Sequence, residues 1–225
     1  MTTAATKPAR SAESVRAPKL RADATRNRER IVLAARDAFV EHGAEVPLDE
    51  IAKRAGVGNA TLYRNFPDRT SLIKAVALLV KGRILALAET AAAEADGGTG
   101  PFDALQRFAH ATVEEKVGAL CTVFGTRVDP FDPDVVEIRD RMRAAVGGLL
   151  ERARAAGELR PDVDHGDLFI AIAQLSRPLP NTSCRMLDDF VHRHLQLFLD
   201  GLRAPARSVL PGRPATFEDF QAAHH

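Results

Sequence analysis

The chain has 225 residues, of which 45% are hydrophobic and 27% are charged, and its formal net charge at pH 7 is +1. This composition supplies enough core for one or two compact domains, which excludes disorder throughout. The charge is unevenly spread, because residues 1–83 hold 16 Lys and Arg against 9 Asp and Glu, whereas the remainder holds 15 against 21. Balances of +7 and −6 favour a basic nucleic-acid face on an acidic body.

The first 22 residues are rich in Ala, Thr, Ser, Lys and Arg and show no hydrophobic periodicity. We therefore expect a disordered basic arm over residues 1–22. A mobile cationic segment is attracted to DNA phosphates without a fixed pose, but a solvated tail is an equal alternative. Arg26 and Arg28, at the start of the next helix, are better placed to contact DNA.

Three short helical patterns follow, separated by Gly43 and by the run Gly56-Val57-Gly58. The first has one face at helical spacing, which consists of Ile31, Ala34, Ala35, Ala38, Phe39 and His42. The second repeats this spacing through Leu48, Ile51, Ala52 and Ala55. Pro47 can open this helix at its first position, and Gly56 can end it in the left-handed conformation.

The third pattern is short and two-faced. Val57, Leu62 and Phe66 are apolar, so that the third helix would bury Leu62 and Phe66 and leave its polar residues outward. This order of helices is the layout of a helix-turn-helix, whose second helix lies in the DNA major groove. The residues that we expect to contact DNA are Arg26, Arg28, Asn59, Thr61, Tyr63, Arg64, Asn65 and Arg69.

Residues 48–57 (LDEIAKRAGV) and 60–69 (ATLYRNFPDR) resemble the DNA-binding domain of the tetracycline-repressor (TetR) family. The resemblance covers roughly residues 27–80, and the rest matches the family only in length and helical pattern. It implies a homodimeric repressor that a small-molecule ligand releases from a palindromic operator in double-stranded DNA. Two departures are Gly58, where many members carry a capping serine, and Val46-Pro47-Leu48, which replaces a threonine-led helix start.

Each DNA-facing side chain also has a structural alternative. The Tyr63 hydroxyl could donate to a phosphate, or the ring could be structural. Asn59 and Thr61 could touch adenine and thymine edges, or they could cap the helix. Arg64 could help bind DNA or complement the helix dipole. Arg69, at the start of the fourth helix, is expected to contact phosphate.

The remaining patterns are also helical. A fourth helix begins at residues 68–71 and ends at the break of residues 97–101, and further apolar sets occupy 102–117, 135–153 and 168–175. Breaks between them carry the turn and start signals Asp129-Pro130, Asp132-Pro133, Gly157 and Pro161. The last helix has an apolar stripe through Leu187, Phe190, Val191, His194, Leu195, Phe198 and Leu202. No convincing strand pattern appears, which predicts an all-α fold.

We expect four segments. These are the arm (1–22), a three-helix helix-turn-helix DNA-binding domain (23–68), a larger helical bundle for ligand binding and dimerisation (69–202), and a loose tail (203–225). The tail holds Pro205, Pro211 and Pro214, and whether its Phe217 and Phe220 pack back on the bundle stays open.

The family resemblance implies a small-molecule pocket among the central helices and a dimer interface on the last two. Candidate pocket residues are Phe102, Phe108, His110, Cys121, Phe124, Met142, Phe169 and Arg177. Ordinary core packing is the alternative for the aromatic and Met members, and Arg177 could instead pair with an Asp at the interface. Candidate interface residues are Leu187, Phe190, Val191, His194 and Phe198.

Several classes of protein are disfavoured. The two cysteines, Cys121 and Cys184, suggest neither a disulfide framework nor a zinc site, and a reducing cytoplasm fits. The chain shows no membrane-spanning run, signal peptide, nucleophile elbow, phosphate loop or zinc-protease motif. We therefore expect no enzyme activity, no cofactor or metal, and no membrane partner. A DNA-binding regulator controlled by a protein partner or by its abundance, without a ligand, remains the alternative function.

Overall fold

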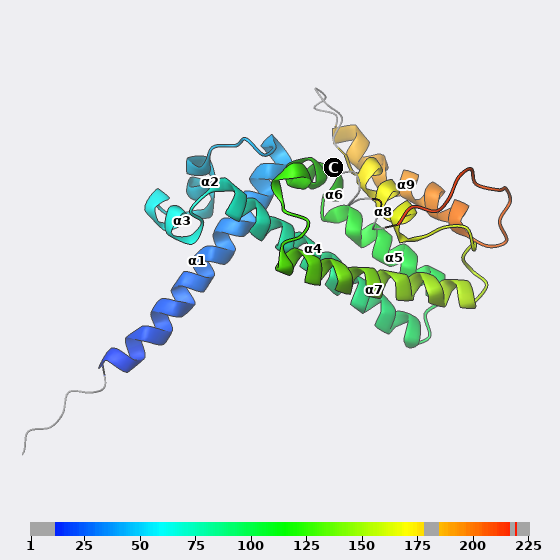
Figure 1. Ribbon diagram of the computed structural model, residues 1–225, viewed down its shortest axis with the longest axis horizontal. Helices are drawn as coiled ribbons and strands as arrows, with labels where there is room; N and C mark the ends of the chain where they lie inside the picture. The colour runs from blue at the N-terminus through cyan, green and yellow to red at the C-terminus, as the bar shows by residue number, and fades with distance from the viewer. Residues whose placement is uncertain (1–11, 178–184, 217–218, 220–225) are drawn as a thin grey trace, which may run out of the picture.

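The computed structural model describes residues 12–177, 185–216 and 219, with helices and no β-strand in these ranges. The α-helices are α1 (Ala12–His42), α2 (Leu48–Ala55), α3 (Asn59–Asn65), α4 (Arg69–Asp96), α5 (Pro101–Glu114), α6 (Val117–Phe124), α7 (Pro133–Ala155), α8 (His165–Leu175) and α9 (Arg185–Leu202), and a 3-10 turn, η1 (Gly125–Arg127), follows α6. The predicted all-α fold class is confirmed. We call residues 23–68 the head and residues 69–202 the body (Figure 1).

The head is built around the second half of α1, against which α2 and α3 pack. Its core contains apolar side chains from all three helices, namely Ile31, Ala35, Ala38, Phe39, Ile51, Ala52, Leu62 and Phe66. The inward face predicted for the first helix is present, except that His42 is exposed. The reason is its position as the last residue of α1, where its imidazole Nε2 lies 3.4 Å from Glu41 and 3.7 Å from Glu50.

The turns of the head depend on two glycines. Gly43 has φ +78° and Gly56 has φ +64°, a left-handed region that favours glycine. A Cβ atom on Gly56 would also lie 2.5 Å from the Nη2 atom of Arg30. Gly56 ends α2 as predicted, whereas Pro47 is the N-cap of α2 and not its first residue.

The helix α1 begins at Ala12, so residues 12–22 are helical where the composition predicted a disordered arm. Most of these residues are strong helix formers, and they extend a helix that already exists, which avoids the cost of nucleation. Figure 1 shows this part of α1 projecting past α2 and α3. Residues 1–11 of the expected arm lie outside the described residues.

The body is organised around α4, which packs against α5 and α7. The Asp68 carboxylate caps its first turn by accepting the N–H of Ser71 at 2.7 Å. Along its length α4 buries Leu72, Ile73, Val76, Ala77, Val80, Ile84, Leu85, Ala88 and Ala91. Because α4 also contacts α1, one continuous helix joins the core of the body to the head.

The short helix α6 was not predicted as a separate element. It is divided from α5 at Glu115 and Lys116, and Lys116 has φ +56°, which is uncommon for a residue other than glycine. The sequence has no Gly or Pro at this point to indicate a turn. The apolar run predicted over residues 102–117 therefore ends earlier, and a second helix starts in a new direction.

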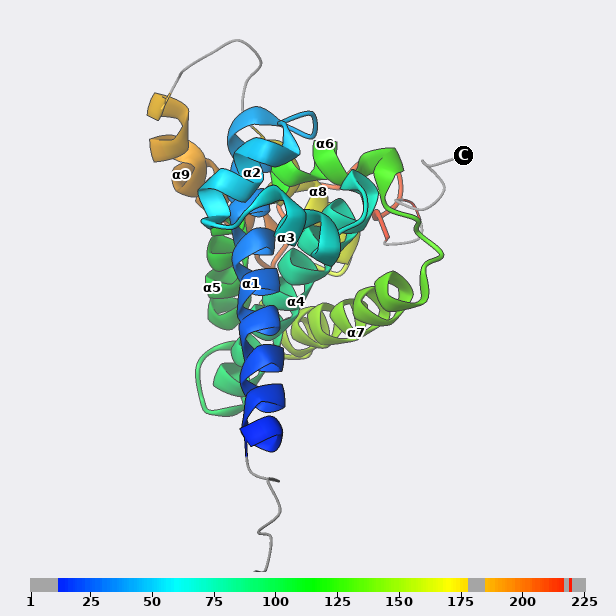
Figure 2. The same ribbon diagram turned by 90° about the vertical axis from the view of Figure 1, so that its left-hand side faces the viewer.

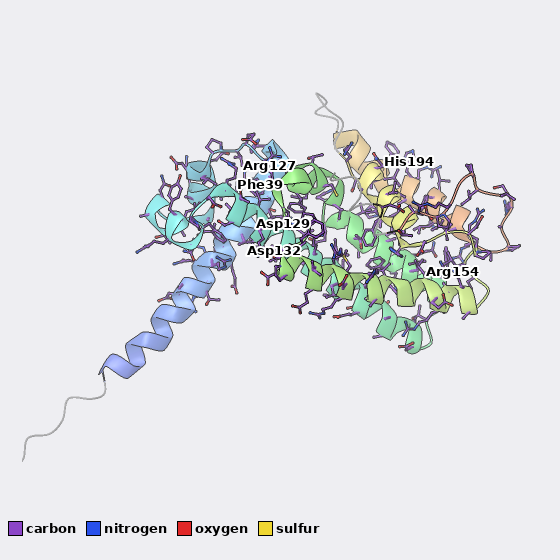
Figure 3. All side chains as sticks on the ribbon, in the orientation of Figure 1. Phe39, Arg127, Asp129, Asp132, Arg154 and His194 are labelled. Atoms are coloured by element: carbon purple, nitrogen blue, oxygen red, sulfur yellow. The ribbon has the colours of Figure 1, made fainter. Side chains whose placement is uncertain are left out.

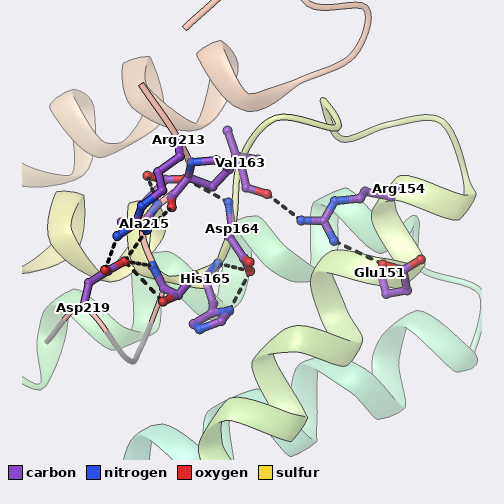
Figure 4. Close-up of polar contacts among 11 residues, drawn as sticks. Glu151, Arg154, Val163, Asp164, His165, Arg213, Ala215 and Asp219 are labelled. Atoms are coloured by element: carbon purple, nitrogen blue, oxygen red, sulfur yellow. Dashed lines mark hydrogen bonds and ion pairs between the residues drawn. The ribbon is translucent and has the colours of Figure 1, made fainter. Parts of the chain in front are cut away.

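The tail from residue 203 to 216 packs against the body, which differs from the loose segment that its prolines predicted. Arg160 Nη2 donates to the Ser208 carbonyl oxygen at 2.7 Å, and the Ala215 N–H donates to Asp167 Oδ1 at 3.1 Å. Figure 4 shows Ala215, Arg213 and Asp219 gathered beside the start of α8. Phe217 and Phe220 lie outside the described residues.

None of the helices in the described ranges combines the length and the apolar character that crossing a lipid bilayer requires.

Candidate nucleic-acid interface

The helix α3 lies at one end of the molecule with one face inward and one outward. Leu62 and Phe66 are each 1% exposed and fix α3 to the head. Asn59, Tyr63 and Arg64 are exposed, and Tyr63 is 48% exposed. Figure 2, viewed from the head, shows α2 and α3 in front of the body. The arrangement therefore offers a polar helix face that no other described element covers.

Within α3, the polar side chains after the first turn bond locally. Arg64 donates from Nε to the Ala60 carbonyl at 3.2 Å and from Nη2 to Thr61 Oγ1 at 3.0 Å. Asn65 Nδ2 donates to the Thr61 carbonyl at 2.8 Å. No side chain caps the start of α3, because Gly58 is its N-cap. Asn59 is therefore not the N-cap that was weighed as its alternative role.

Arg28 fastens the C-terminal end of α3 to α1. Its Nη1 donates to the Asn65 carbonyl at 3.1 Å, and its guanidinium lies 4.3 Å from the centroid of the Phe66 ring. Arg30 makes a parallel contact to the Gly56 carbonyl at 3.3 Å. Arg26 is exposed and pairs with Asp23. Contacts of Arg26 and Arg28 with DNA stay predictions.

Arg69 has a structural role that the sequence did not indicate. Its Nη1 donates to the carbonyl oxygens of Ala44 and Val46 at 2.6 and 2.7 Å, which ties the turn before α2 to the start of α4. The side chain is only partly exposed. Its contact with a DNA phosphate stays a prediction and would have to coexist with these two bonds.

Ion pairs join the head to the body. Arg36 Nη2 from α1 and Arg83 Nη1 from α4 both lie 3.3 Å from the same atom, Glu115 Oε2. Arg127 pairs with Glu45 at 2.8 Å, and Figure 3 shows Arg127 close to the head, near Phe39. A displacement of α4 relative to α1 would therefore change contacts between the head and the body.

The eight candidate pocket residues fall into three groups. Four of them, Phe102, Phe108, Met142 and Phe169, are buried in the core of the body. The Phe108 and Phe169 rings meet edge to face, with centroids 6.4 Å apart at 81°. This packing agrees with the core alternative for these four residues, and a ligand contact by any of them stays a prediction.

His110 belongs to a polar network between α5 and α9. Its Nδ1 lies 2.9 Å from His192 Nδ1 and its Nε2 lies 3.0 Å from Gln196 Oε1. His192 Nε2 in turn lies 2.6 Å from Glu114 Oε1. The sequence singled out His110 but not Gln196 or Glu114, because these partners become neighbours only when α9 packs on α5.

The other three candidates, Cys121, Phe124 and Arg177, lie on α6 and just after α8. The Cys121 thiol has a raised pKa because the surrounding protein excludes water, although the positive charges of Lys81 and Arg177 act in the opposite direction. Lys81, which the sequence did not single out, therefore lies near Cys121. A separate hollow of about 680 Å³, lined by residues such as Arg160, Arg203 and Arg207, contains none of the eight candidates.

The helix α9 has an apolar outer face. Phe190 and Leu197 are 44% and 62% exposed, and the exposed His194 lies between them at helical spacing. Leu195 and Leu199 on the opposite side are fully buried. Figure 3 labels His194 on the outer side of the body.

The candidate interface residues therefore divide between the two faces of α9. Val191 and Phe198 pack partly against the core, and the side chain of Leu187 lies outside the described set. Leu197 was missed because the stripe read from the sequence mixed the inner and outer faces.

Comparison with known proteins identifies both parts of the chain. Residues 31–76 match the family described as bacterial regulatory proteins, tetR family, and residues 100–204 match the C-terminal domain of SbtR-like transcriptional regulators. A TetR regulator from Streptomyces coelicolor is 31% identical, with 80% of this chain and 99% of that chain covered and a TM-score of 0.58. A TetR regulator from Mycobacterium vanbaalenii is 34% identical, with coverages of 82% and 99% and a TM-score of 0.57.

Two more distant likenesses add detail. LfrR from Mycobacterium smegmatis, solved in complex with proflavine, is 21% identical with a TM-score of 0.57, covers 83% of this chain and 99% of its own, and shows the fold alone. An HTH-type transcriptional regulator of Staphylococcus aureus is 44% identical over 54 residues, which is 24% of this chain and 29% of that protein. The chain thus matches less than a third of the length of that relative.

Proposed function

This chain belongs to the TetR family of DNA-binding transcriptional regulators, and from that premise we propose that it is a homodimeric repressor released from a palindromic operator by a small-molecule effector. The observation that carries the DNA-binding part is α3, which is anchored by Leu62 and leaves Tyr63 48% exposed. A helix of this kind enters the major groove and positions side chains on phosphates and base edges.

The outer face of α9 supports the homodimer. Phe190, His194 and Leu197 form an exposed stripe on a helix whose other side is buried in the core. Exposed apolar patches of this kind mark interfaces, and a two-fold dimer presents identical surfaces to each other. Two α3 helices about 34 to 36 Å apart would then meet two operator half-sites one DNA turn apart.

The continuity of α4 supports release by an effector. It contributes both to the core of the body and to the contact with α1, so a ligand that prefers one position of α4 also favours one spacing of the two heads. The expected coupling is about 1 to 3 kcal/mol, or roughly 5- to 150-fold in operator affinity. The proflavine complex of LfrR supports a small-molecule effector here by analogy.

The test is fluorescence anisotropy on duplex DNA from upstream of the chain's own gene, at two salt concentrations. The wild-type protein should bind a palindromic segment tightly, and binding should weaken with salt as released counterions predict. Tyr63→Ala should weaken it by about tenfold, the value of a hydrogen bond to a charged group, and Tyr63→Phe should share the loss if the hydroxyl makes the contact.

The matched control is Phe131→Ala, because Phe131 is an aromatic that is 67% exposed in the connection before α7. It should bind DNA as the wild type does. If Tyr63→Ala and Phe131→Ala both lost affinity for DNA, or if neither did, the proposed contact of Tyr63 with DNA would be contradicted. A titration in which no compound changes operator affinity would favour control by a protein partner or by abundance.

A further inference from the structure

A continuous row of polar side chains joins α5 to α9. His110 Nδ1 lies 2.9 Å from His192 Nδ1, and His110 Nε2 lies 3.0 Å from Gln196 Oε1. His192 Nε2 lies 2.6 Å from Glu114 Oε1. We call His110 and His192 the histidine pair. All four of its nitrogen atoms have a polar neighbour within hydrogen-bond distance.

The partners of the two outer nitrogen atoms show that both of these atoms carry hydrogen. Gln196 Nε2 donates to Asp200 Oδ1 at 2.8 Å, which orients the amide so that its oxygen faces His110. Because an amide oxygen only accepts, His110 Nε2 must be the donor. Glu114 is exposed, and an ionised carboxylate also only accepts, so His192 Nε2 must be its donor.

The two inner nitrogen atoms of the histidine pair point at each other. The Nδ1 atoms are 2.9 Å apart and the ring centroids are 5.1 Å apart, a difference that is nearly the width of an imidazole ring. Each Nδ1 therefore lies on the line toward the other ring, and the ring planes differ by 25°. Two neutral rings with hydrogen on Nε2 would place two lone pairs against each other here. One additional proton converts this repulsion into an N–H···N hydrogen bond of ordinary length.

A metal ion does not fit between the same two atoms. Imidazole nitrogen binds Zn²⁺ at about 2.0 to 2.1 Å, so an ion on the line between two nitrogen atoms would hold them about 4 Å apart. The part of the chain that the structure describes also contains no group of three His, Cys, Asp or Glu side chains suited to a metal. The spacing therefore agrees with a proton and not with a metal ion.

Glu114 supplies the counter-charge for this additional proton. Within the described residues, it is the one charged group in hydrogen-bond or ion-pair contact with either imidazole. Arg193, the next residue after His192 on α9, is exposed. Charged side chains of the adjoining elements have other partners, namely Arg107 of α5 with Glu94, Arg36 of α1 and Arg83 of α4 with Glu115, Asp167 of α8 with the Ala215 N–H, and Arg203 after α9 with Asp103.

We propose that His110 and His192 share one proton and that the protonated pair is a pH-sensitive contact between α5 and α9. Loss of the shared proton would leave two lone pairs facing each other. Gain of a second proton would set two N–H groups and two positive charges against each other. Either change removes the hydrogen bond between the helices, so the contact should be strongest at an intermediate pH, near the range in which histidine changes its charge.

The place of the histidine pair connects it to the head. Glu114 is followed by Glu115, which binds Arg36 of the head and Arg83 of α4. Arg36 Nη2 also donates to the Glu114 carbonyl oxygen at 3.5 Å. The same end of α5 therefore contacts both α1 and, through the histidine pair, α9. The shared proton goes beyond the proposed function, and only an effect of pH on the dimer rests on it.

The first test is NMR of the full-length protein labelled with ¹⁵N at histidine, from about pH 4.5 to about pH 9.5, which brackets the range in which histidine changes charge. A scalar coupling between the two Nδ1 nuclei across the hydrogen bond should appear at an intermediate pH and be lost at both ends. The signal is assigned by its absence in His110→Ala and in His192→Ala. Only pH values at which the amide spectrum shows a folded protein are compared.

The second test is a double-mutant cycle of His110→Ala and His192→Ala, measured by urea denaturation at one protomer concentration. At the intermediate pH, the unfolding constant of the double variant should depart about tenfold from the combined effects of the single variants, near the low end for a hydrogen bond to a charged group. The departure should fall to about twofold or less at both ends of the pH range. His192→Asn, whose neutral amide can donate to His110 Nδ1, should keep part of the contact and lose its pH dependence.

A matched cycle combines His110→Ala with His194→Ala. The imidazole of His194 is on the same helix as His192, but its Nδ1 lies 2.8 Å from the Phe190 carbonyl oxygen of α9 itself. This cycle should show no interaction at any pH, because the two side chains share no partner.

Absence of the Nδ1 coupling at every pH, or a His110–His192 interaction that is the same across the pH range, would overturn the shared proton. Sedimentation of the wild-type protein measures the dimer separately. A dimer without the Nδ1 coupling would remove this inference and leave the proposed homodimer standing. The coupling in a protein that sediments as a monomer would do the reverse.

Discussion

The outer face of α3 and the surface of the body differ in how their cations are neutralised. In the body, Arg107 pairs with Glu94 at 2.8 Å and Arg152 with Asp96 at 3.0 Å. The helix α3 contains no acidic residue, and its single cation, Arg64, bonds only to neutral oxygens of its own helix. Positive charge without a carboxylate thus occurs on α3, where DNA is the expected partner.

The largest effect should come from removing the core of the head. Phe39→Ala should lower the free energy of unfolding by about 3 to 5 kcal/mol, because Phe39 is fully buried and leaves a cavity. Urea denaturation followed by circular dichroism measures it. Tyr63→Ala, on the exposed face of the same head, should change stability by about 0.5 kcal/mol or less. Similar losses of unfolding free energy in Phe39→Ala and Tyr63→Ala would contradict the assignment of a buried inner face and an exposed outer face to the head.

The next effect concerns the packing of α6 against α8 in the body. Gly118→Ala should destabilise by about 1 to 3 kcal/mol or more, because the new methyl group would meet the backbone of α8. Gly147→Ala is the matched control, since Gly147 lies within α7 with nothing within 4 Å of the added Cβ atom. It should raise stability by up to about 1 kcal/mol through helix propensity. Equal thermal midpoints for the two variants would show that α6 and α8 are not packed this closely.

A smaller effect of opposite sign is expected at Lys81. Lys81→Met should raise the free energy of unfolding at pH 7 by about 1 kcal/mol, because it removes a poorly hydrated charge that has no ion-pair partner among the described residues. The folded state lowers the pKa of Lys81 below its ordinary 10.5, so the unfolded state binds more protons between the two values. Stability of the wild type should therefore gain from this group as pH rises toward 10.5, and the variant should lack that gain.

Denaturation at pH 7 and pH 10 checks this prediction, with Lys74→Met as the comparison. Lys74 has two carboxylate partners that raise its pKa, so its loss should not stabilise the protein. A Lys81→Met variant less stable than the wild type at pH 7 would mean that the lysine has a partner of its own in solution.

The smallest effect should appear in acid. The hydrogen bond from Lys74 lowers the pKa of Asp132 below 3.8, so stability from this pair is present above that pH and is lost as pH falls through the lowered value. Asp132→Asn keeps a capping oxygen for α7 but weakens the ion pair, and its deficit relative to wild type should shrink between pH 7 and pH 3. Glu137→Gln, at an exposed position of the same helix, should show no such trend.

Local signals were sufficient for much of the head. Gly43 and Gly56 both adopt positive φ at the ends of helices, and the spacing of Leu62 and Phe66 correctly predicted the buried side of α3. The contacts of Arg69 were not predictable in this way. Its two carbonyl partners lie more than 20 residues earlier in the chain, and only the folded head brings them together.

In the body, helices could be predicted but not their meeting points. The break before α6 depends on Lys116 at positive φ, a conformation that tertiary packing imposes and that no local residue indicates. In the sequence, nothing distinguishes Lys81 from an ordinary surface lysine of a long helix. Its surroundings include Cys121 and Arg139, which two other helices supply. Periodicity specifies which side of a helix is apolar, but not which polar groups of different helices become neighbours.

The shared carboxylate of Glu115 has a consequence for genetics. One oxygen atom receives Arg36 from the head and Arg83 from α4, and the side chains of Arg36 and Glu115 are only 15% and 17% exposed. Glu115 therefore links α1 of the head to α4 of the body through one carboxylate that lies on neither surface. Under the proposed function, substitutions of Glu115 should appear in a genetic selection as variants that still bind the operator and the effector. These variants should no longer release the operator when the effector binds.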